Sequence, residues 1–184
     1  MPPGLREDTV EGWTKAGLVT CHVLFFLHLQ TRRVIIPDLT PHSTGEWIAD
    51  IVRGLTACAG GLNGARYCIH DRGGQYTAQF DNMPEEAGIH PIRLPPMSPN
   101  LNAYAERFVL TIKSECLNHL IPVGEASLRK AVGEFLEYYH SERPHQGIGN
   151  VVPFPDDTLA GNSGRVMLKK RLGDLLKFYY RDAA

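Results

Sequence analysis

The fold is decided by a stretch of sequence that reads IHDRGGQYT at residues 69–77 and SPNLNAYAERF at residues 98–108. Asp71 follows a short apolar run typical of a strand, and Glu106 falls one turn inside a predicted helix, with 34 residues between the two. Strand ends and first helix turns are the places where α/β folds carry functional side chains. Two carboxylates placed in this way, joined by a third, can bind divalent metal ions for phosphodiester chemistry.

The apolar residues before this stretch follow the pattern of β-strands. Runs rich in β-branched and aromatic residues predict three strands, at residues 9–13, 18–27 and 33–36. Pro37 is expected to end the third strand, because proline cannot donate to a strand ladder. Since the links between the strands are short, we expect an antiparallel meander.

A helix and two more strands follow the meander. The helix begins at Ser43 or Thr44, either of which can cap it, and ends before the glycine pair at residues 60–61. Strands are predicted at residues 66–70 and 89–94, and a helix between strands implies a crossover with a parallel neighbour. We therefore predict an α/β fold with a five-stranded mixed sheet, three antiparallel strands followed by two parallel ones, flanked by helices.

The C-terminal half is predicted to be mainly helical. Three helices are expected, at residues 76–87, 102–120 and 127–139. Beyond Gly147 several prolines and glycines predict weaker order. We therefore assign residues 1–150 to one domain and residues 151–184 to a weakly structured extension. That extension contains a short basic segment, with Arg165, Lys169, Lys170 and Arg171.

Composition narrows the class of protein. The chain has 184 residues, of which 43% are hydrophobic, so it can bury a core. Its net charge of −1 gives no support to nucleic-acid binding by the whole surface, so any basic surface must be local. The longest apolar run, Val23–Leu27, is too short to span a bilayer, and no signal peptide is recognisable. The four cysteines are scattered, as expected of reduced thiols in a cytoplasmic protein without a membrane partner.

The predicted helix that carries Glu106 has two faces. Glu106 and Lys113 are seven residues apart, nearly two turns, and therefore share one face. The core stripe is predicted to contain Phe108, Ile112 and Cys116. A glutamate can bind metal while a lysine on the same face binds phosphate. Taken singly, Asp71 is equally explained as a turn residue, Glu106 as a partner of the helix dipole and Lys113 as a surface charge.

Three motifs in order carry a resemblance to a known family. They are residues 70–77, residues 98–108 and the segment YYHSERPHQG at 138–147. Together they resemble the integrase catalytic core of DDE transposases and retroviral-type integrases, which has a ribonuclease H-like fold. The similarity extends from about Val10 to about Asn150.

The resemblance implies a site and an activity. It makes Asp71 the second and Glu106 the third ligand of two Mg²⁺ or Mn²⁺ ions. The DNA-binding residues that it implies are Lys113, Arg107, Arg72, Asn102 and Arg143. The family cleaves transposon DNA ends and joins them to target DNA, without a covalent protein–DNA intermediate, and works as a homodimer or larger assembly on DNA.

The first metal ligand departs from the family pattern. Counting along the first strand puts Arg6 where the family has its first aspartate, and the nearest aspartate, Asp8, comes two residues later. Two residues correspond to about 6.6 Å along a strand, and metal coordination tolerates only tenths of an ångström. Asp8 is therefore expected to be the first ligand only if the strand is shortened. Otherwise truncation at this position impairs the enzyme.

Two alternatives remain open. The first is a non-catalytic remnant that binds DNA or dimerises, with salt-sensitive DNA binding through Lys113 and the basic segment 165–171. The second is a ribonuclease H-like nuclease that only hydrolyses. The proline-rich loop before Glu106 and the Arg143-Pro144-His145 turn favour the integrase branch over this second alternative.

Overall fold

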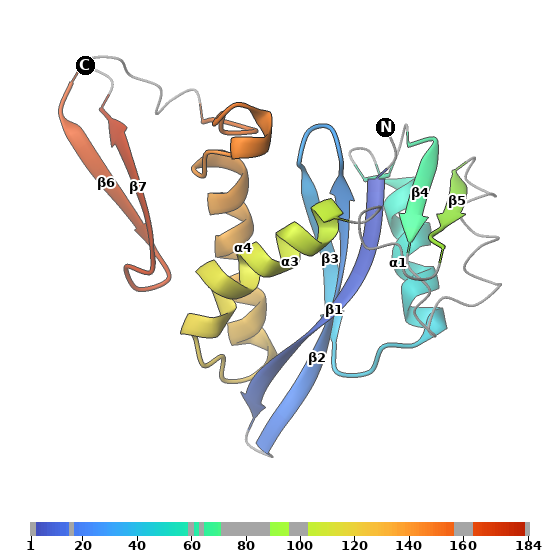
Figure 1. Ribbon diagram of the computed structural model, residues 1–184. Helices are drawn as coiled ribbons and strands as arrows, with labels where there is room; N and C mark the ends of the chain where they lie inside the picture. Colours follow the sequence, from blue (N-terminus) through green and yellow to red (C-terminus); the bar gives the residue numbers. More distant parts are fainter. Residues whose placement is uncertain are drawn as a thin grey trace. The chain divides into compact units, whose positions relative to one another are not determined.

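The computed structural model describes residues 3–14, 17–58, 61–62, 65–70, 89–95, 103–156 and 164–182; at residues 3–14, it describes the side chains of Thr9 and Val10 alone. Figure 1 labels the helices and strands of the chain, which divides into two compact units. Unit 1 comprises residues 1–11 and 18–109, and unit 2 comprises residues 12–17 and 110–184.

Within the described residues, the larger of two sheets contains five strands in the order β3-β2-β1-β4-β5. The strands are β1 (Pro3–Thr14), β2 (Gly17–His28), β3 (Val34–Thr40), β4 (Tyr67–His70) and β5 (His90–Arg93). β2 and β3 pair antiparallel, whereas β4 pairs parallel with both β1 and β5. The sheet is therefore mixed, and the α/β class predicted from the sequence is confirmed.

Two strand boundaries differ from the predictions. β1 begins at Pro3, well before residue 9, because the pairing of Gly4 with Ile69 extends the ladder through a segment of weak strand propensity. β3 continues through Pro37, so the predicted end there is wrong. The register shifts between Leu24 and Phe26, which is where an edge strand can accommodate a proline in a bulge.

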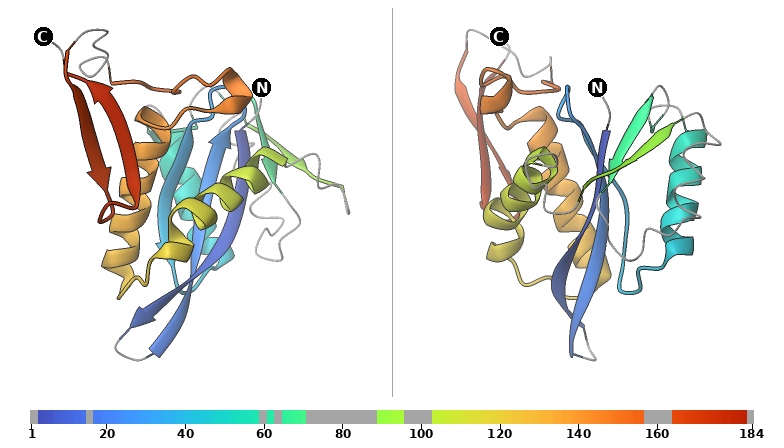
Figure 2. Two further views of the ribbon diagram at one scale, coloured as in Figure 1. Left: turned by 60° about the vertical axis from the view of Figure 1, so that its left-hand side comes forward. Right: turned by 45° about the vertical axis from the view of Figure 1, so that its right-hand side comes forward.

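α1 (Gly45–Ala57) covers one face of the sheet (Figure 2). Of the two candidate caps, Thr44 takes the role, since its side chain accepts a hydrogen bond of 3.1 Å from the Trp47 backbone amide. The Trp47 indole then donates to Asp38 on β3 over 2.8 Å. The buried core under α1 contains Leu24, Phe26, Ile48, Val52, Leu62, Cys68 and Ile89.

The opposite side of β2 receives α3 (Ala103–Glu115). Phe25 alternates with Leu24 and Phe26 along the strand, and its ring lies 5.0 Å from that of Phe108. Both phenylalanines are almost completely buried. This contact fixes the first half of α3 against the sheet of unit 1.

Unit 2 continues from α3 and ends in a β-hairpin. Its elements are η2 (Leu117–His119), α4 (Glu125–Ser141), η3 (Gln146–Ile148), β6 (Val166–Arg171) and β7 (Leu176–Arg181). α3 ends at Glu115 rather than near Leu120, and a 3₁₀ turn completes the predicted helix. The prediction of weak structure beyond Gly147 is also wrong for the β6–β7 hairpin, which has long-range anchors that are described below. The helix predicted at residues 76–87 lies outside the described residues.

The described helices include none that is long and apolar enough to cross a membrane. Cys21, Cys68 and Cys116 are buried free thiols. Burial raises the pKa of Cys68 to about 12, and burial followed by the charge of Glu134 raises the pKa of Cys116 to about 12. These two thiols are therefore inert packing groups.

Candidate metal and DNA site

Glu106 lies in the first turn of α3 and is half-buried. The buried face of α3 contains Ala105, Phe108, Val109 and Ile112, and Cys116 directly after the helix is buried as well. The core stripe predicted from the sequence is thus confirmed. Glu106 borders this stripe, so its backbone is held by packing while its side chain keeps access to solvent.

The first turn of α3 has a second anchor in unit 1. The guanidinium of Arg32 lies 3.7 Å from the centroid of the Tyr104 ring, a cation–π contact. Arg32 lies in the turn between β2 and β3 and has a left-handed backbone, with φ of 63°. The contact links that turn to the helix turn that carries Glu106. Sequence reasoning missed it, because nothing local pairs residues so far apart.

The end of β4 leads directly to Asp71, which lies outside the described residues. His70, the last residue of β4, is completely buried, and its backbone pairs with Leu5 of β1 and with Arg93 of β5. The Leu94 amide also donates to the His70 carbonyl over 3.0 Å. The strand that delivers Asp71 is therefore central and fixed on both sides.

Asp8 belongs to β1, but its side chain is not described. Because His70 pairs with Leu5, the next residue along β1 is Arg6, and Asp8 follows about 6.6 Å further on. β1 is a strand of 12 residues. Whether Asp8 is the first metal ligand stays a prediction.

The predicted DNA-binding residues occupy different settings. Lys113 is half-buried on α3, about 10 Å along the helix axis from Glu106. Arg107 is exposed on the same helix. Arg72 and Asn102 lie outside the described residues. In the part of the chain with described side chains, no group of three His, Cys, Asp or Glu side chains could hold a metal ion.

Arg143, also predicted to bind DNA, makes a forked ion pair inside unit 2. Its Nε and Nη2 donate to the two carboxylate oxygens of Glu115 over 2.9 and 2.6 Å. Both side chains are about two-thirds covered or more, at 26% and 32% exposure. The pair joins the end of α3 to the chain after α4.

A double-mutant cycle on this pair should show coupling. We expect Arg143→Gln and Glu115→Gln each to lower the free energy of unfolding, with a coupling energy of about 1 kcal/mol. Urea denaturation measures it, and additive effects would contradict a structural role for the pair. A DNA contact by Arg143 would appear separately, as a loss of DNA affinity in Arg143→Gln that Glu115→Gln does not share.

Comparisons with known proteins show which family and which solved structures the chain is similar to. Residues 87–153, which include β5, α3 and α4, match the family described as integrase core domain. An uncharacterized 39.2 kDa protein of insertion element IS476 from Xanthomonas euvesicatoria is 31% identical over 84 residues. That match covers 45% of this chain and only 24% of the relative, so the chain spans a fraction of that protein's length.

Solved structures show the same fold. The catalytic core of BIV integrase has a TM-score of 0.55 at 18% identity, covering 82% of this chain and 90% of that one. The HTLV-2 integrase catalytic core, solved as a dimer with magnesium, has a TM-score of 0.58 at 13% identity, covering 83% and 95%. A simian T-cell lymphotropic virus intasome chain has a TM-score of 0.58 at 14% identity, covering 97% and 66%. Residues 87–153 are therefore similar to the integrase core domain family, and the chain shares the fold of integrase catalytic cores.

Proposed function

We propose that the chain is a DDE-type transposase or integrase catalytic domain that cleaves DNA and transfers the cut strand to target DNA. The observation that carries this proposal is the placement of Glu106. It lies half-buried at the start of a helix packed on the sheet, within the segment that matches the integrase core family. Residues 1–150 would form this catalytic domain.

The carboxylates at the candidate site fit divalent metal ions. Asp71, Glu106 and Asp8 offer only hard oxygen ligands, which suit Mg²⁺ and Mn²⁺. The HTLV-2 core with the same fold was solved with magnesium, which supports this choice. Two bound ions would supply Lewis-acid activation and charge stabilisation for phosphoryl transfer.

The basic residues of the site would hold the DNA. Lys113, Arg107, Arg72, Asn102 and Arg143 are proposed to contact the phosphodiester backbone, which positions the strand without reading its sequence. The HTLV-2 core was solved as a dimer and the simian T-cell lymphotropic virus chain in an intasome, which supports a homodimer or larger assembly on DNA as the working form.

The proposal is tested on supercoiled plasmid DNA mixed with a labelled oligonucleotide. The wild-type chain should nick the plasmid and join the oligonucleotide to it in Mn²⁺ or Mg²⁺, and do neither in EDTA. Nicking without joined product would favour the ribonuclease H-like nuclease. Absence of both reactions in either metal would contradict the proposal.

A non-catalytic remnant is the second candidate, and the β1–β4 register favours it. Leu5 pairs with His70, and Asp71 comes directly after His70. The residue of β1 at the corresponding position, directly after Leu5, is Arg6 and not an aspartate. A remnant without the metal site would show no rise in Tm on adding Mn²⁺, whereas a protein that binds the ion must be stabilised by it.

A further inference from the structure

The β6–β7 hairpin has two faces of different character. Its register pairs residues directly across the ladder, and alternate rungs point to the same face. One face contains the rungs Val166–Arg181, Leu168–Tyr179 and Lys170–Lys177. The other contains Met167–Tyr180, Lys169–Phe178 and Arg171–Leu176. These are called the outer and the inner face.

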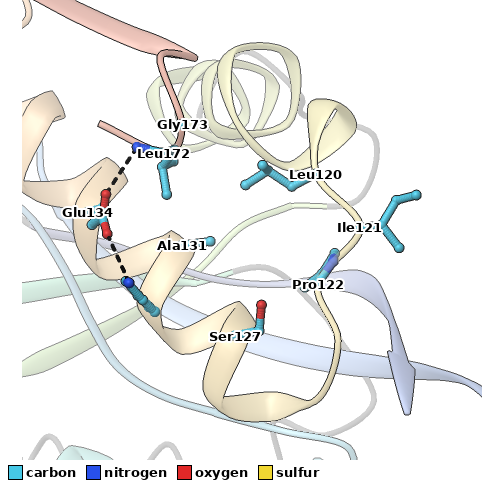
Figure 3. A pocket seen from close by; sticks show the side chains of 9 residues that line it. Leu120, Ile121, Pro122, Ser127, Ala131, Glu134, Leu172 and Gly173 are labelled. Carbon is cyan, nitrogen blue, oxygen red and sulfur yellow. Dashed lines mark hydrogen bonds and ion pairs between the residues drawn. The ribbon is translucent and has the colours of Figure 1, made fainter. Parts of the chain in front are cut away.

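The inner face is anchored to α4 and its C-cap. Arg171 donates to both carboxylate oxygens of Glu142 and forms a second ion pair of 2.6 Å with Glu137. Lys169 pairs with the same Glu142 over 2.7 Å. At the hairpin turn, the Leu172 amide donates to Glu134 over 3.1 Å (Figure 3). The basic residues of the inner face therefore neutralise acids of the protein itself.

The outer face is exposed at all three rungs. Tyr179 is 64% exposed, and Lys170, Lys177 and Arg181 give the face three cations. Lys170 and Lys177 are directly opposite each other, an arrangement that destabilises an isolated hairpin by repulsion. Asp174 offsets the charge of Lys170 through an ion pair of 2.7 Å. Among the residues that the structure describes, no acid lies within ion-pair distance of Lys177.

We propose that the outer face of the hairpin binds the phosphate backbone of duplex DNA. A two-stranded ribbon fits the major groove, and lysine and arginine supply the charge that neutralises phosphates. This proposal rests on the proposed function, which supplies DNA as the partner. The proposal also changes the role predicted for the basic segment 165–171. Lys169 and Arg171 anchor the hairpin to Glu142, and Lys177 and Arg181 replace them as DNA-binding residues.

The test compares Lys170→Gln/Lys177→Gln with the wild type on a random-sequence 30-base-pair duplex. Binding is measured in EDTA as a function of salt. We expect the slope of log affinity against log salt to become shallower by about 2, one for each phosphate contact. Near 0.1 M salt the double variant should bind about 10- to 100-fold more weakly. Its Tm should not fall, because the substitutions remove a repulsive pair.

The matched control is Arg53→Gln/Arg129→Gln, which removes two exposed charges that pair with acids on α1 and α4. It should keep the wild-type slope, and an equal loss in this control would overturn the proposal. So would an unchanged slope in the lysine variant, or a wild type that binds phosphatidylserine vesicles but no DNA. Because the assay contains EDTA and needs no catalysis, its failure is distinguishable from failure of the strand-transfer assay.

Discussion

Glu106→Gln should abolish metal-dependent DNA strand cleavage, lowering the rate at least about 100-fold, with little effect on folding. Substitution of groups that merely orient metal ligands already costs 10- to 100-fold, so loss of a ligand should cost more. The amide has the same size as the carboxylate but carries no negative charge for a cation. Because Glu106 is only half-buried, the change should be tolerated by the packing of α3. Plasmid nicking in Mn²⁺ measures the effect.

The control for this variant is Glu125→Gln. Glu125 lies in the first turn of α4, as Glu106 lies in the first turn of α3. Each carboxylate therefore stabilises its helix by about 0.3–1 kcal/mol through the helix dipole. Its ion pair with Arg129 is exposed, so its loss should cost little. Equal activities of the two variants would show that Glu106 stabilises its helix and does not bind metal. Asp71→Asn should reproduce the loss seen in Glu106→Gln, and activity that survives it would contradict the assigned ligands.

The elements predicted well from the sequence are those specified by local patterns. The spacing of Phe108, Ile112 and Cys116 identified the buried face of α3, because a helix repeats every 3.6 residues whatever packs against it. Thr44 and Ser43 were both recognisable as caps, but only the hydrogen bond to Trp47 decides between them.

The features missed depend on partners distant in sequence. Pro37 can stay in a strand because β3 is an edge strand, which is a property of the sheet and not of the local sequence. The hairpin segment was predicted to be weakly structured because its anchors on α4 and the α4 C-cap lie 27 or more residues away, as in the pairs of Lys169 and Arg171 with Glu142. Arg32 and Tyr104, which fix the turn that carries Glu106, are likewise far apart in the chain.

Glu142→Gln should release the β6–β7 hairpin from α4. Glu142 is 1% exposed and balances both Arg171, which is 12% exposed, and Lys169. Removing one partner of a buried ion pair costs about 3–5 kcal/mol, because the remaining charge stays buried without compensation. We expect about 3 kcal/mol, since Lys169 can turn toward water. Hydrogen exchange of the amides in β6 and β7 should then be about 100-fold faster.

Glu137→Gln is the matched control, because Glu137 binds the same Arg171 but is 67% exposed. Its loss should cost less than about 1 kcal/mol, as expected of a surface pair. Equal exchange rates in the two variants would contradict the role of the buried carboxylate. Both substitutions remove one glutamate charge from the same arginine, but Glu142 is also buried and pairs with Lys169 as well.

The pH dependence of the anchor follows from the charge on Glu142. Burial alone would raise the pKa of this carboxyl, but the hydrogen bonds from Arg171 and Lys169 outweigh it and hold the pKa below its ordinary value of 4.5. A lowered pKa in the folded state means that the stabilisation is complete above pH 4.5 and is lost as the pH falls through the folded value. The difference in hairpin protection between wild type and Glu142→Gln should therefore be full at pH 7 and shrink below pH 4.5. A difference that stays constant through that range would show that shape, not charge, holds the hairpin.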